Sequence, residues 1–373
     1  MSKIGLALLP PSITNEQAIR LLRAVSKANF AIGEMKASFK HTALSSSLLS
    51  VFFLNESVQS TRIEGTQVTF SDMLDMELNQ KAKWEQQEVL NYMNALNLGI
   101  EKIQNGAPIT TRLIKELHSV LMKNARGTNS AGGEYRRIQN FIGPDNDIKH
   151  AVYIPVIAAD VDKYMENLEF FINGEAHQSI AKGIKKDFVI DENCEEILKI
   201  AIMHAQFESI HPFLDGNGRM GRILIAILAV KLGLVDKPIF LVSEELEKER
   251  ARYYDLLNGV RGASPDWYSW LYFFVIASER MAKKLMKKLR KAEMLREAGE
   301  KKCLLSSEKR VWLYSFKNPV FTTSQVANGA SLSLGTARKC SNKLSEKGLF
   351  YADENKKRNK KYRNYEIIRI LSE

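Results

Sequence analysis

The sequence lacks the features that mark several large classes of protein. No run among its 373 residues approaches eighteen consecutive apolar residues, about the length that a membrane-spanning helix needs. The first residues, Met-Ser-Lys-Ile, do not follow a secretory pattern. The three cysteines are widely spaced, so they predict neither a disulfide framework nor a zinc site. We therefore expect a cytoplasmic protein that does not contact a membrane.

Histidine is scarce as well, with six scattered residues. His204 and His211 are seven positions apart and have no third ligand nearby, so the sequence predicts no structural metal. His118 falls in an amphipathic helix predicted for residues 110–123, where we expect an ordinary core or surface histidine. The rest of the composition is that of a globular protein, with 45% hydrophobic and 26% charged residues in a chain long enough for two or three domains.

Charge is distributed unevenly along the chain. Residues 281–373 contain 23 Lys and Arg against 9 Asp and Glu, whereas the preceding 280 residues contain 31 against 34. The whole excess of +11 therefore comes from the last quarter of the chain. Such an asymmetry predicts a separate C-terminal module.

The most informative stretch is residues 211–222, His-Pro-Phe-Leu-Asp-Gly-Asn-Gly-Arg-Met-Gly-Arg, which we call the signature stretch. Helical periodicity predicts one helix before it, over residues 194–208, and another after it, over about 219–232. Gly216, Asn217 and Gly218 can adopt backbone angles that turn successive N–H groups into one concavity. With the N-terminus of the following helix, this concavity is suited to bind an anion.

The side chains around this concavity indicate what the anion is. Arg219 and Arg222 are three positions apart, so both can reach phosphate oxygens from one helical turn. Asp215 offers one oxygen ligand for Mg²⁺, and His211 is the side chain best suited to accept a proton near neutral pH. Each residue alone fits a capped helix with a core histidine and solvated arginines. Together they describe transfer of a phosphate-containing group to a hydroxyl.

The signature stretch resembles the Fic family pattern His-x-Phe-x-Asp/Glu-Gly-Asn-Gly-Arg-x-x-Arg at every specified position. Fic proteins are mostly adenylyltransferases, which move AMP from ATP onto a Ser, Thr or Tyr hydroxyl of a protein. The resemblance implies ATP and Mg²⁺ as cofactors, His211 as the base and Asp215 as the metal ligand. It also implies nucleotide contacts from Gly216, Asn217, Gly218, Arg219, Gly221 and Arg222.

Residues 60–65, Ser-Thr-Arg-Ile-Glu-Gly, read by themselves as the end of a helix with a C-terminal glycine. They also fit the pattern Ser/Thr-x-x-x-Glu-Gly/Asn of the inhibitory helix that many Fic proteins carry. The resemblance then implies that Ser60 and Glu64 are inhibitory, with Glu64 paired to Arg222 where the γ-phosphate of ATP has to bind. A bidentate carboxylate–guanidinium pair must break before phosphate can use that arginine.

Residues 133–156 contain two short β-prone runs around a polar Gly/Pro turn, which predicts an irregular hairpin. A surface hairpin without a role is the plain interpretation. In Fic proteins the equivalent segment, which often begins Gly-x-Tyr-Arg, is a flap that holds the target peptide as an added strand. The resemblance also suggests nucleotide contacts from Ile142 and Gly143.

A helix predicted for residues 243–260 contains Tyr253, Tyr254 and Leu257. These side chains fit an ordinary helical core. In Fic proteins a Tyr-Tyr-x-x-Leu segment lines the adenine pocket, so the resemblance makes them contacts for the base.

The basic C-terminal region begins with a charged helix over residues 278–302. Three further helices are predicted at 311–315, 323–327 and 333–347, followed by two strands within 349–369 around a basic turn at 355–361. This order resembles a winged helix, in which Arg338, Lys339 and Lys343 could meet DNA phosphates or bases. A protein-docking or dimerising module with a merely soluble surface remains the alternative.

We therefore expect a mainly α fold, a Fic-type helical bundle with a β-hairpin flap followed by a winged helix-turn-helix domain. The expected regions are residues 1–110 with the inhibitory motif, 111–280 as the catalytic core, 281–304 as a helical connector and 305–373 as the winged helix. The expected partners are ATP, a target protein docked on the flap, the chain itself in self-modification or a homodimer, and DNA or protein at the winged helix. Two alternatives remain open: a Fic enzyme of different transfer chemistry, and a nucleotide sensor in a DNA-binding regulator.

Overall fold

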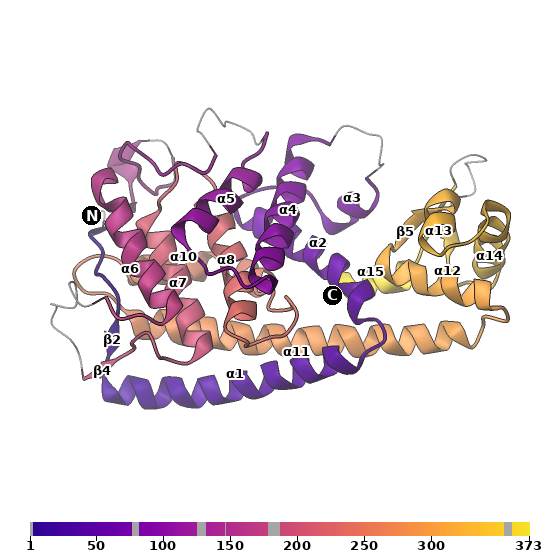
Figure 1. The fold of residues 1–373 in the computed structure, drawn as a ribbon, viewed down its shortest axis with the longest axis horizontal. Helices are drawn as coiled ribbons and strands as arrows, with labels where there is room; N and C mark the ends of the chain where they lie inside the picture. Colours follow the sequence, from indigo (N-terminus) through magenta and orange to yellow (C-terminus); the bar gives the residue numbers. More distant parts are fainter. Residues whose placement is uncertain (1–2, 77–81, 125–131, 146, 178–186, 354–359) are drawn as a thin grey trace. The chain divides into compact units, whose positions relative to one another are not determined.

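The computed structural model describes residues 3–76, 82–124, 132–145, 147–177, 187–353 and 360–373. Helices account for most of these residues, which confirms the expected mainly α class (Figure 1). The chain forms two compact units, each of which is built from several segments. The first contains Met1–Gly33, Gln59–Gln67 and Lys83–Ala282, and the second contains Glu34–Val58, Val68–Ala82 and Lys283–Glu373.

The centre of the first unit is a pair of packed helices, α7 (Glu196–Ile210) and α8 (Asn217–Lys231). Nearly every residue of both helices is buried, as expected for helices that are hydrophobic on all sides. Around them pack α4 (Trp84–Gln104), α5 (Thr111–Leu121) and α6 (Val161–Asn173). Gly99 lets α4 approach α8 closely, because a Cβ there would collide with the side chain of Ile227.

The remaining elements of the first unit are short or shared with the second unit. Strand β1 (Lys3–Ile4) pairs in parallel with β3 (Tyr153–Ile154), and β2 (Ser12–Ile13) pairs antiparallel with β4 (Phe188–Val189). The long helices α1 (Asn15–His41), α2 (Ser45–Ile63) and α11 (Trp267–Glu300) each contribute residues to both units. The other elements are η1 (Ile148–His150), η2 (Ala158–Asp160), α9 (Ser243–Lys248) and α10 (Arg250–Gly259).

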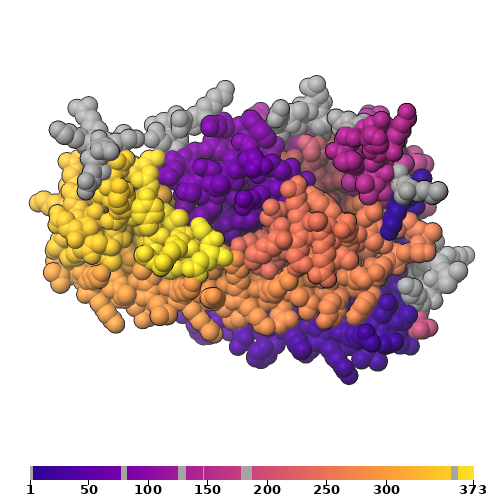
Figure 2. All heavy atoms as spheres, turned by 180° about the vertical axis from the view of Figure 1, so that it is seen from behind, coloured from indigo at the N-terminus to yellow at the C-terminus, as the bar shows by residue number. Residues whose placement is uncertain are grey.

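The second unit contains the C-terminal helices and a three-stranded antiparallel sheet of order β5-β7-β6. Its elements are α3 (Phe70–Leu74), α12 (Ser306–Lys317), β5 (Val320–Thr322), α13 (Thr323–Gly329), α14 (Leu334–Glu346), β6 (Tyr351–Ala352), β7 (Lys361–Arg363) and α15 (Tyr365–Ser372). Buried aromatic side chains form its core: Trp312, Phe316, Phe321 and Phe350. In Figure 2 the yellow α15 lies against the orange α11, consistent with a 2.8 Å hydrogen bond from Lys288 Nζ to the carbonyl of Leu371.

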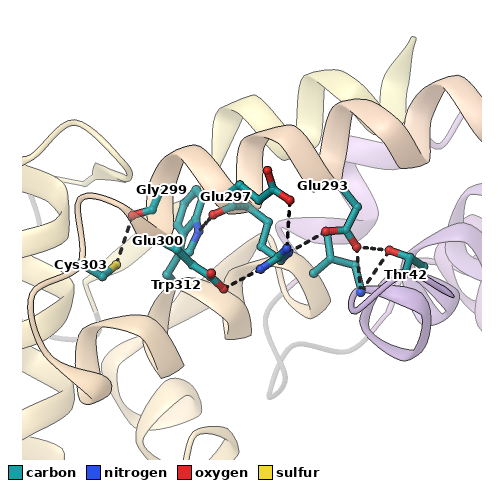
Figure 3. A network of polar contacts seen from close by, with 9 residues as sticks. Thr42, Glu293, Glu297, Gly299, Glu300, Cys303 and Trp312 are labelled. Atoms are coloured by element: carbon teal, nitrogen blue, oxygen red, sulfur yellow. Dashed lines mark hydrogen bonds and ion pairs between the residues drawn. The ribbon is translucent and has the colours of Figure 1, made fainter.

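Polar contacts fix the C-terminal part of α11 within the second unit (Figure 3). The indole N–H of Trp312 donates to the carbonyl of Arg296 at 2.9 Å, and Arg296 pairs with Glu293 at 2.6 Å and with Glu300 at 2.9 Å. Glu293 also accepts the backbone N–H of Leu44 at 3.2 Å. Because these partners come from both ends of the sequence, they attach the start of α2 to the C-terminal helices.

The irregular hairpin predicted within residues 133–156 has, among its described residues, one antiparallel bridge, between Ile142 and Tyr153, and Tyr153 also pairs with Lys3 of β1. Several other sequence-based boundaries were wrong. The charged helix is not separate, because nothing in the sequence from 267 to 298 breaks the helix, and α11 runs through both regions. The strand expected up to residue 369 ends at Arg363, where Asn364 caps a helix with its side chain.

Two more segments differ from the prediction. The helix expected over residues 243–260 is divided at Glu249 into α9 and α10. Residues 1 to about 55 were expected to be helical, but the short strands β1 and β2 precede α1, since each finds a partner strand more than 100 residues away in the sequence. Among the described helices, none is long and apolar enough to cross a membrane.

Candidate active site

The signature stretch forms a tight connection from α7 to α8. His211 ends α7 in the left-handed conformation, with φ 50°, and Gly216 does the same before α8, with φ 78°. The Asn217 side chain spans the loop: it donates to the carbonyl of Phe213 and accepts the N–H of Phe213, both at 2.9 Å. These constraints turn the loop sharply and direct the N-terminus of α8 toward solvent.

A cavity of about 320 Å³ opens at this N-terminus, within the usual range for small-molecule sites. It brings together the signature stretch, the end of the predicted inhibitory motif and the start of α4. The lining residues are Glu64, Gly65, Thr66, Trp84, Glu88, His211, Leu214, Asp215, Gly216, Asn217, Gly218 and Arg219. Most of the predicted phosphate-binding residues therefore face one space, and Gly221 and Arg222 are buried next to it in α8.

His211 has the protonation state that a base needs. Its Nδ1 lies 3.3 Å from the carbonyl oxygen of Glu208. Because a carbonyl oxygen only accepts hydrogen bonds, Nδ1 carries the proton and Nε2 keeps its lone pair. Burial, together with the charge of Arg261, lowers the pKa of His211 to about 4, so the imidazole is neutral at pH 7.

The backbone around His211 is held by Arg136, a buried residue that the sequence analysis did not single out. Its Nε donates to the carbonyl of His211 at 3.0 Å, and its backbone N–H donates to the carbonyl of Pro212 at 2.9 Å. Its Nη2 reaches the carbonyls of Val156 and Ile210. Arg136 is the arginine of the Gly-x-Tyr-Arg string, so that string was the signal that could have identified it.

Asp215 is half-exposed beside the anion-binding loop, with 56% of its side chain accessible. Its Oδ1 accepts the N–H of Gly216 at 2.6 Å and lies 3.4 Å from Nη2 of Arg219. Among the described residues, no group of three or more His, Cys, Asp or Glu could enclose a metal ion. One accessible carboxylate next to a helix N-terminus fits Mg²⁺, which would take its remaining ligands from phosphate oxygens and water.

Glu64 and Arg222 form an ion pair, with 2.5 Å between Glu64 Oε1 and Arg222 Nη2. Arg222 is 1% exposed and also donates to the hydroxyl of Ser60 at 2.8 Å and to its carbonyl at 3.0 Å. A Cβ at Gly218 would collide with the Glu64 carboxylate, so the pair lies over the anion-binding loop. Burial by itself would raise the pKa of Glu64, but the charge and hydrogen bond of Arg222, together with the charges of Arg219 and His211, outweigh it and the pKa is lowered.

Arg219 has a second carboxylate partner that sequence reasoning missed. Its Nη1 lies 3.2 Å from Oε2 of Glu88 in α4, and both side chains are largely buried. Burial raises the pKa of Glu88 despite the opposing charge of Arg219. The sequence around Glu88 carried no sign of this role, because a glutamate in a polar helix usually faces solvent.

Five other predicted nucleotide contacts do not line this cavity in the described structure: Ile142, Gly143, Tyr253, Tyr254 and Leu257. Tyr253 and Leu257 are buried in α10, and the Tyr253 hydroxyl lies 2.8 Å from Nε2 of His204. Tyr254 is 40% exposed and donates to the carbonyl of Ile63, next to Glu64. Their role in holding a nucleotide therefore stays a prediction.

Comparison with known proteins gives consistent results. The Fic/DOC family N-terminal model matches residues 22–101, and the Fic/DOC family model matches residues 108–229, which together are more than half of the chain. The chain is 25% identical over 244 residues to the "Protein adenylyltransferase Fic" of Drosophila grimshawi, covering 64% of this chain and 41% of that protein. The Drosophila melanogaster protein of the same name is 26% identical over 204 residues, covering 53% and 35%. This chain thus spans about two fifths or less of the length of these curated relatives.

Solved structures agree on the fold. A Fic family protein from Desulfovibrio desulfuricans superimposes with a TM-score of 0.55 at 19% identity, covering 95% of this chain and 98% of that one. A Fic domain containing signaling protein from Bacteroides thetaiotaomicron gives a TM-score of 0.52 at 19% identity, covering 70% and 97%. The two family models, the intact signature stretch and the shared fold lead to one conclusion: the chain belongs to the Fic/DOC family.

Proposed function

We propose that this chain is a protein adenylyltransferase that moves AMP from ATP to a Ser, Thr or Tyr hydroxyl. The observation that carries the proposal is the neutral His211, which faces the same cavity as Asp215 and the N-terminus of α8. The names of the curated relatives support the same activity. In this proposal the imidazole, the carboxylate and the helix N-terminus of the cavity would serve as the base, the metal ligand and the phosphate-binding loop that the reaction needs.

In the proposed reaction, ATP binds with its phosphates along the backbone from Gly216 and on Arg219 and Arg222. The oxygen of the target hydroxyl forms a bond to the α-phosphorus, and the bond from this phosphorus to the bridging oxygen breaks, so that pyrophosphate leaves. His211 Nε2 takes the proton of the hydroxyl. Mg²⁺ held at Asp215 would supply charge neutralisation on the phosphates. Positioning by the rigid loop supplies much of the rate enhancement.

Glu64 is the proposed brake on this reaction. Its carboxylate occupies Arg222 and lies against Gly218, so a triphosphate would have to displace it to contact either residue. Ser60 supports the brake because its hydroxyl and carbonyl orient the same guanidinium. The segment is therefore autoinhibitory in our proposal, and self-modification is its simplest readout.

The decisive experiment is the intact mass of the purified wild type, Glu64→Gly and the Glu64→Gly/His211→Ala double mutant after incubation with ATP and Mg²⁺. We expect a gain of one or more AMP groups in Glu64→Gly, little gain in the wild type and none in the double mutant. A gain matching phosphate alone would keep the site and overturn the reaction. Comparing transfer from α- and γ-labelled ATP separates these two chemistries directly.

The target is proposed to dock on residues 133–156. The described part of this segment has few internal backbone hydrogen bonds, and Ile138, Ile148 and Val152 are exposed. Exposed apolar side chains beside short stretches of extended backbone suit an added peptide strand. Substituting Val152 by a charged residue should weaken modification of an added peptide without changing ATP binding.

The C-terminal elements α12, β5, α13, α14, β6 and β7 follow the order of a winged helix, and we propose this identity for residues 305–373. Arg338 and Lys339 are exposed on α14, the equivalent of a recognition helix, whereas Lys343 pairs with Glu308 at 2.7 Å. This favours a DNA contact through Arg338 and Lys339 as a second function. A gel shift that weakens with salt and with Arg338→Ala would support it, and no shift at low salt would favour a protein-docking module.

A further inference from the structure

His118 forms hydrogen bonds to two segments of the site, the flap segment and the signature stretch, although it belongs to neither. It lies in α5 and is 3% exposed. Its Nδ1 lies 3.0 Å from the backbone nitrogen of Gly133, at the start of the flap segment, and its Nε2 lies 2.9 Å from the carbonyl oxygen of Asp215. Its ring stacks on that of Phe213, with centroids 3.6 Å apart and planes 3° from parallel.

The two partners fix the tautomer of this histidine. A backbone N–H can only donate, so Nδ1 must offer its lone pair to Gly133. A carbonyl oxygen can only accept, so Nε2 must carry the proton that it donates to Asp215. The neutral Nε2–H form alone satisfies both loops at once, and the stacked Phe213 ring fixes the plane in which both bonds point.

Both loops are fitted closely to α5. At Gly216, a Cβ would lie 2.7 Å from the sulfur of Met122 and 3.3 Å from Nε2 of His118, so only glycine lets the loop approach the imidazole. Gly133 has φ 91°, and a Cβ there would lie 2.8 Å from the carbonyl of Lys115. The two glycines thus leave enough space for the imidazole to lie between the two loops.

We propose that His118 is a positioning residue that sets the backbone of Asp215, and so aims its carboxylate and the adjacent Gly216 N–H at the bound metal–nucleotide. Through Gly133 it also fixes the start of the flap segment relative to the same loop. The proposal rests on the proposed function, because it takes Asp215 to be the Mg²⁺ ligand. Outer partners of this kind commonly change metal affinity by about 10- to 100-fold when they are removed.

Three substitutions separate the two hydrogen bonds. His118→Gln keeps a donor near the position of Nε2 and supports Asp215, whereas His118→Asn keeps an acceptor near Nδ1 and supports Gly133. His118→Phe keeps a flat ring against Phe213 but removes both bonds. Leu117→Ala is the matched control, because Leu117 is buried in the same helix and its side chain lies against Gly99 of α4.

The measurement is Mn²⁺ affinity by electron paramagnetic resonance in the presence of a non-hydrolysable ATP analogue, with every variant made in the Glu64→Gly background. We expect His118→Phe and His118→Asn to weaken Mn²⁺ binding by about 10-fold and His118→Gln by less than about 3-fold. Leu117→Ala should lower the Tm and leave the Mn²⁺ affinity unchanged. Equal affinities in all variants would overturn the proposal, as would losses that simply follow the Tm.

The transfer assay distinguishes this outcome from failure of the proposed function. If Glu64→Gly transfers AMP and the His118 variants bind Mn²⁺ as tightly as their parent, the positioning role is wrong and the enzyme assignment stands. If Glu64→Gly binds Mn²⁺ with the analogue but transfers nothing, the enzyme assignment fails while the Mn²⁺ affinities still test His118.

Discussion

The two sides of the cavity hold their arginines in different ways. Arg222 is paired with Glu64, which directly follows α2 and keeps a third of its side chain exposed. Arg219 is paired with Glu88, which is largely buried and lies inside α4, one of the helices packed on α8. The two arginines are separated by less than one helical turn, so the difference comes from the segments that carry the carboxylates.

The electrostatics follow the same division. The pKa of Glu64 is lowered, so its charged form is favoured in the folded protein, whereas burial raises the pKa of Glu88 and disfavours its charged form. A charged, partly exposed carboxylate at the end of a helix can leave its partner with little rearrangement. A carboxylate inside a packed helix cannot. The comparison therefore separates a releasable contact from a fixed support for the same turn at the start of α8.

We expect the largest effect from His211→Ala, because the contacts of the two arginines can change the transfer rate only while the general base is present. General base catalysis contributes about 10²- to 10⁴-fold, so the transfer rate should fall by that factor in the Glu64→Gly background. The Tm should change little, and nucleotide binding should persist. Intact mass and a binding titration check these points together. Near-parental transfer would mean that another group accepts the proton.

Glu64→Gly should have the next largest effect, with the opposite sign. Loss of a contact worth about 1.4 kcal/mol changes an equilibrium tenfold, so self-modification should rise by about 10-fold or more. Glu64→Gln, which keeps the shape but removes the charge, should rise by less. Arg62→Ala is the control, since it changes the charge of the same turn without touching Arg222. An equal rise in Arg62→Ala would trace the effect to the helix rather than the pair.

Glu88→Gln sharpens the comparison because it weakens the fixed support. We expect transfer in the Glu64→Gly background to fall, by about 3- to 10-fold, since Arg219 loses one charged partner and keeps the more distant Asp215 at 3.4 Å. The same substitution should not release the brake in the wild-type background. An increase in self-modification on Glu88→Gln alone would show that both carboxylates restrain the site.

The acid limb of the pH profile tests His211 itself. Its pKa is lowered to about 4, and the reaction needs the unprotonated form, so the His211-dependent rate should rise as pH increases through about 4 and stay flat from pH 6 to 8. Initial rates of Glu64→Gly between pH 4 and 8 measure this, provided that circular dichroism shows a folded protein throughout. A limb near pH 6.5 would indicate an ordinary solvated histidine.

The sequence was informative where the site is local and silent where it is assembled from a distance. Residues 211–222 carry their own turn chemistry, so the loop, its anion-binding N-terminus and the roles of its side chains could be proposed without a structure. Glu64 was identified through a short pattern whose meaning depended on Arg222. The loop is a case in which neighbouring residues determine the geometry, whereas Glu64 lies 158 positions from Arg222 and was proposed only through the family resemblance.

Glu88 and His118 could not be found in that way, because nothing in their helices differs from an ordinary polar or core residue. Arg136 carried one local signal, its place in the Gly-x-Tyr-Arg string. The partners of Glu88, His118 and Arg136 lie 131, 97 and 75 positions away. The same limit applies to the strands, because β3 pairs with β1 across about 150 residues in addition to its bridge with the nearby Ile142. The long helices were predicted more accurately than the strands, because helical periodicity is local, although the helix ends depended on caps such as Asn364.

The smallest effect concerns stability, and it tests the two carboxylates directly. The folded-state pKa of Glu64 lies below its ordinary value of 4.5, so its charge stabilises the fold above that pH, and the contribution is lost as pH falls through the lowered pKa. The folded-state pKa of Glu88 is raised, so its contribution is fullest below 4.5 and is lost as pH rises through the raised value.

At pH 7, Glu64→Gln should therefore lower the free energy of unfolding by about 1 kcal/mol after solvent screening, and Glu88→Gln should change it by less than about 0.5 kcal/mol. Urea titrations at pH 7 and pH 4.5 measure both. The deficit of Glu64→Gln should shrink at the lower pH, because protonation begins to remove the same charge from the wild type. If Glu88→Gln were the more destabilising substitution at pH 7, the buried pair would be the main electrostatic support of the turn and the contrast between the two sides of the cavity would be reversed.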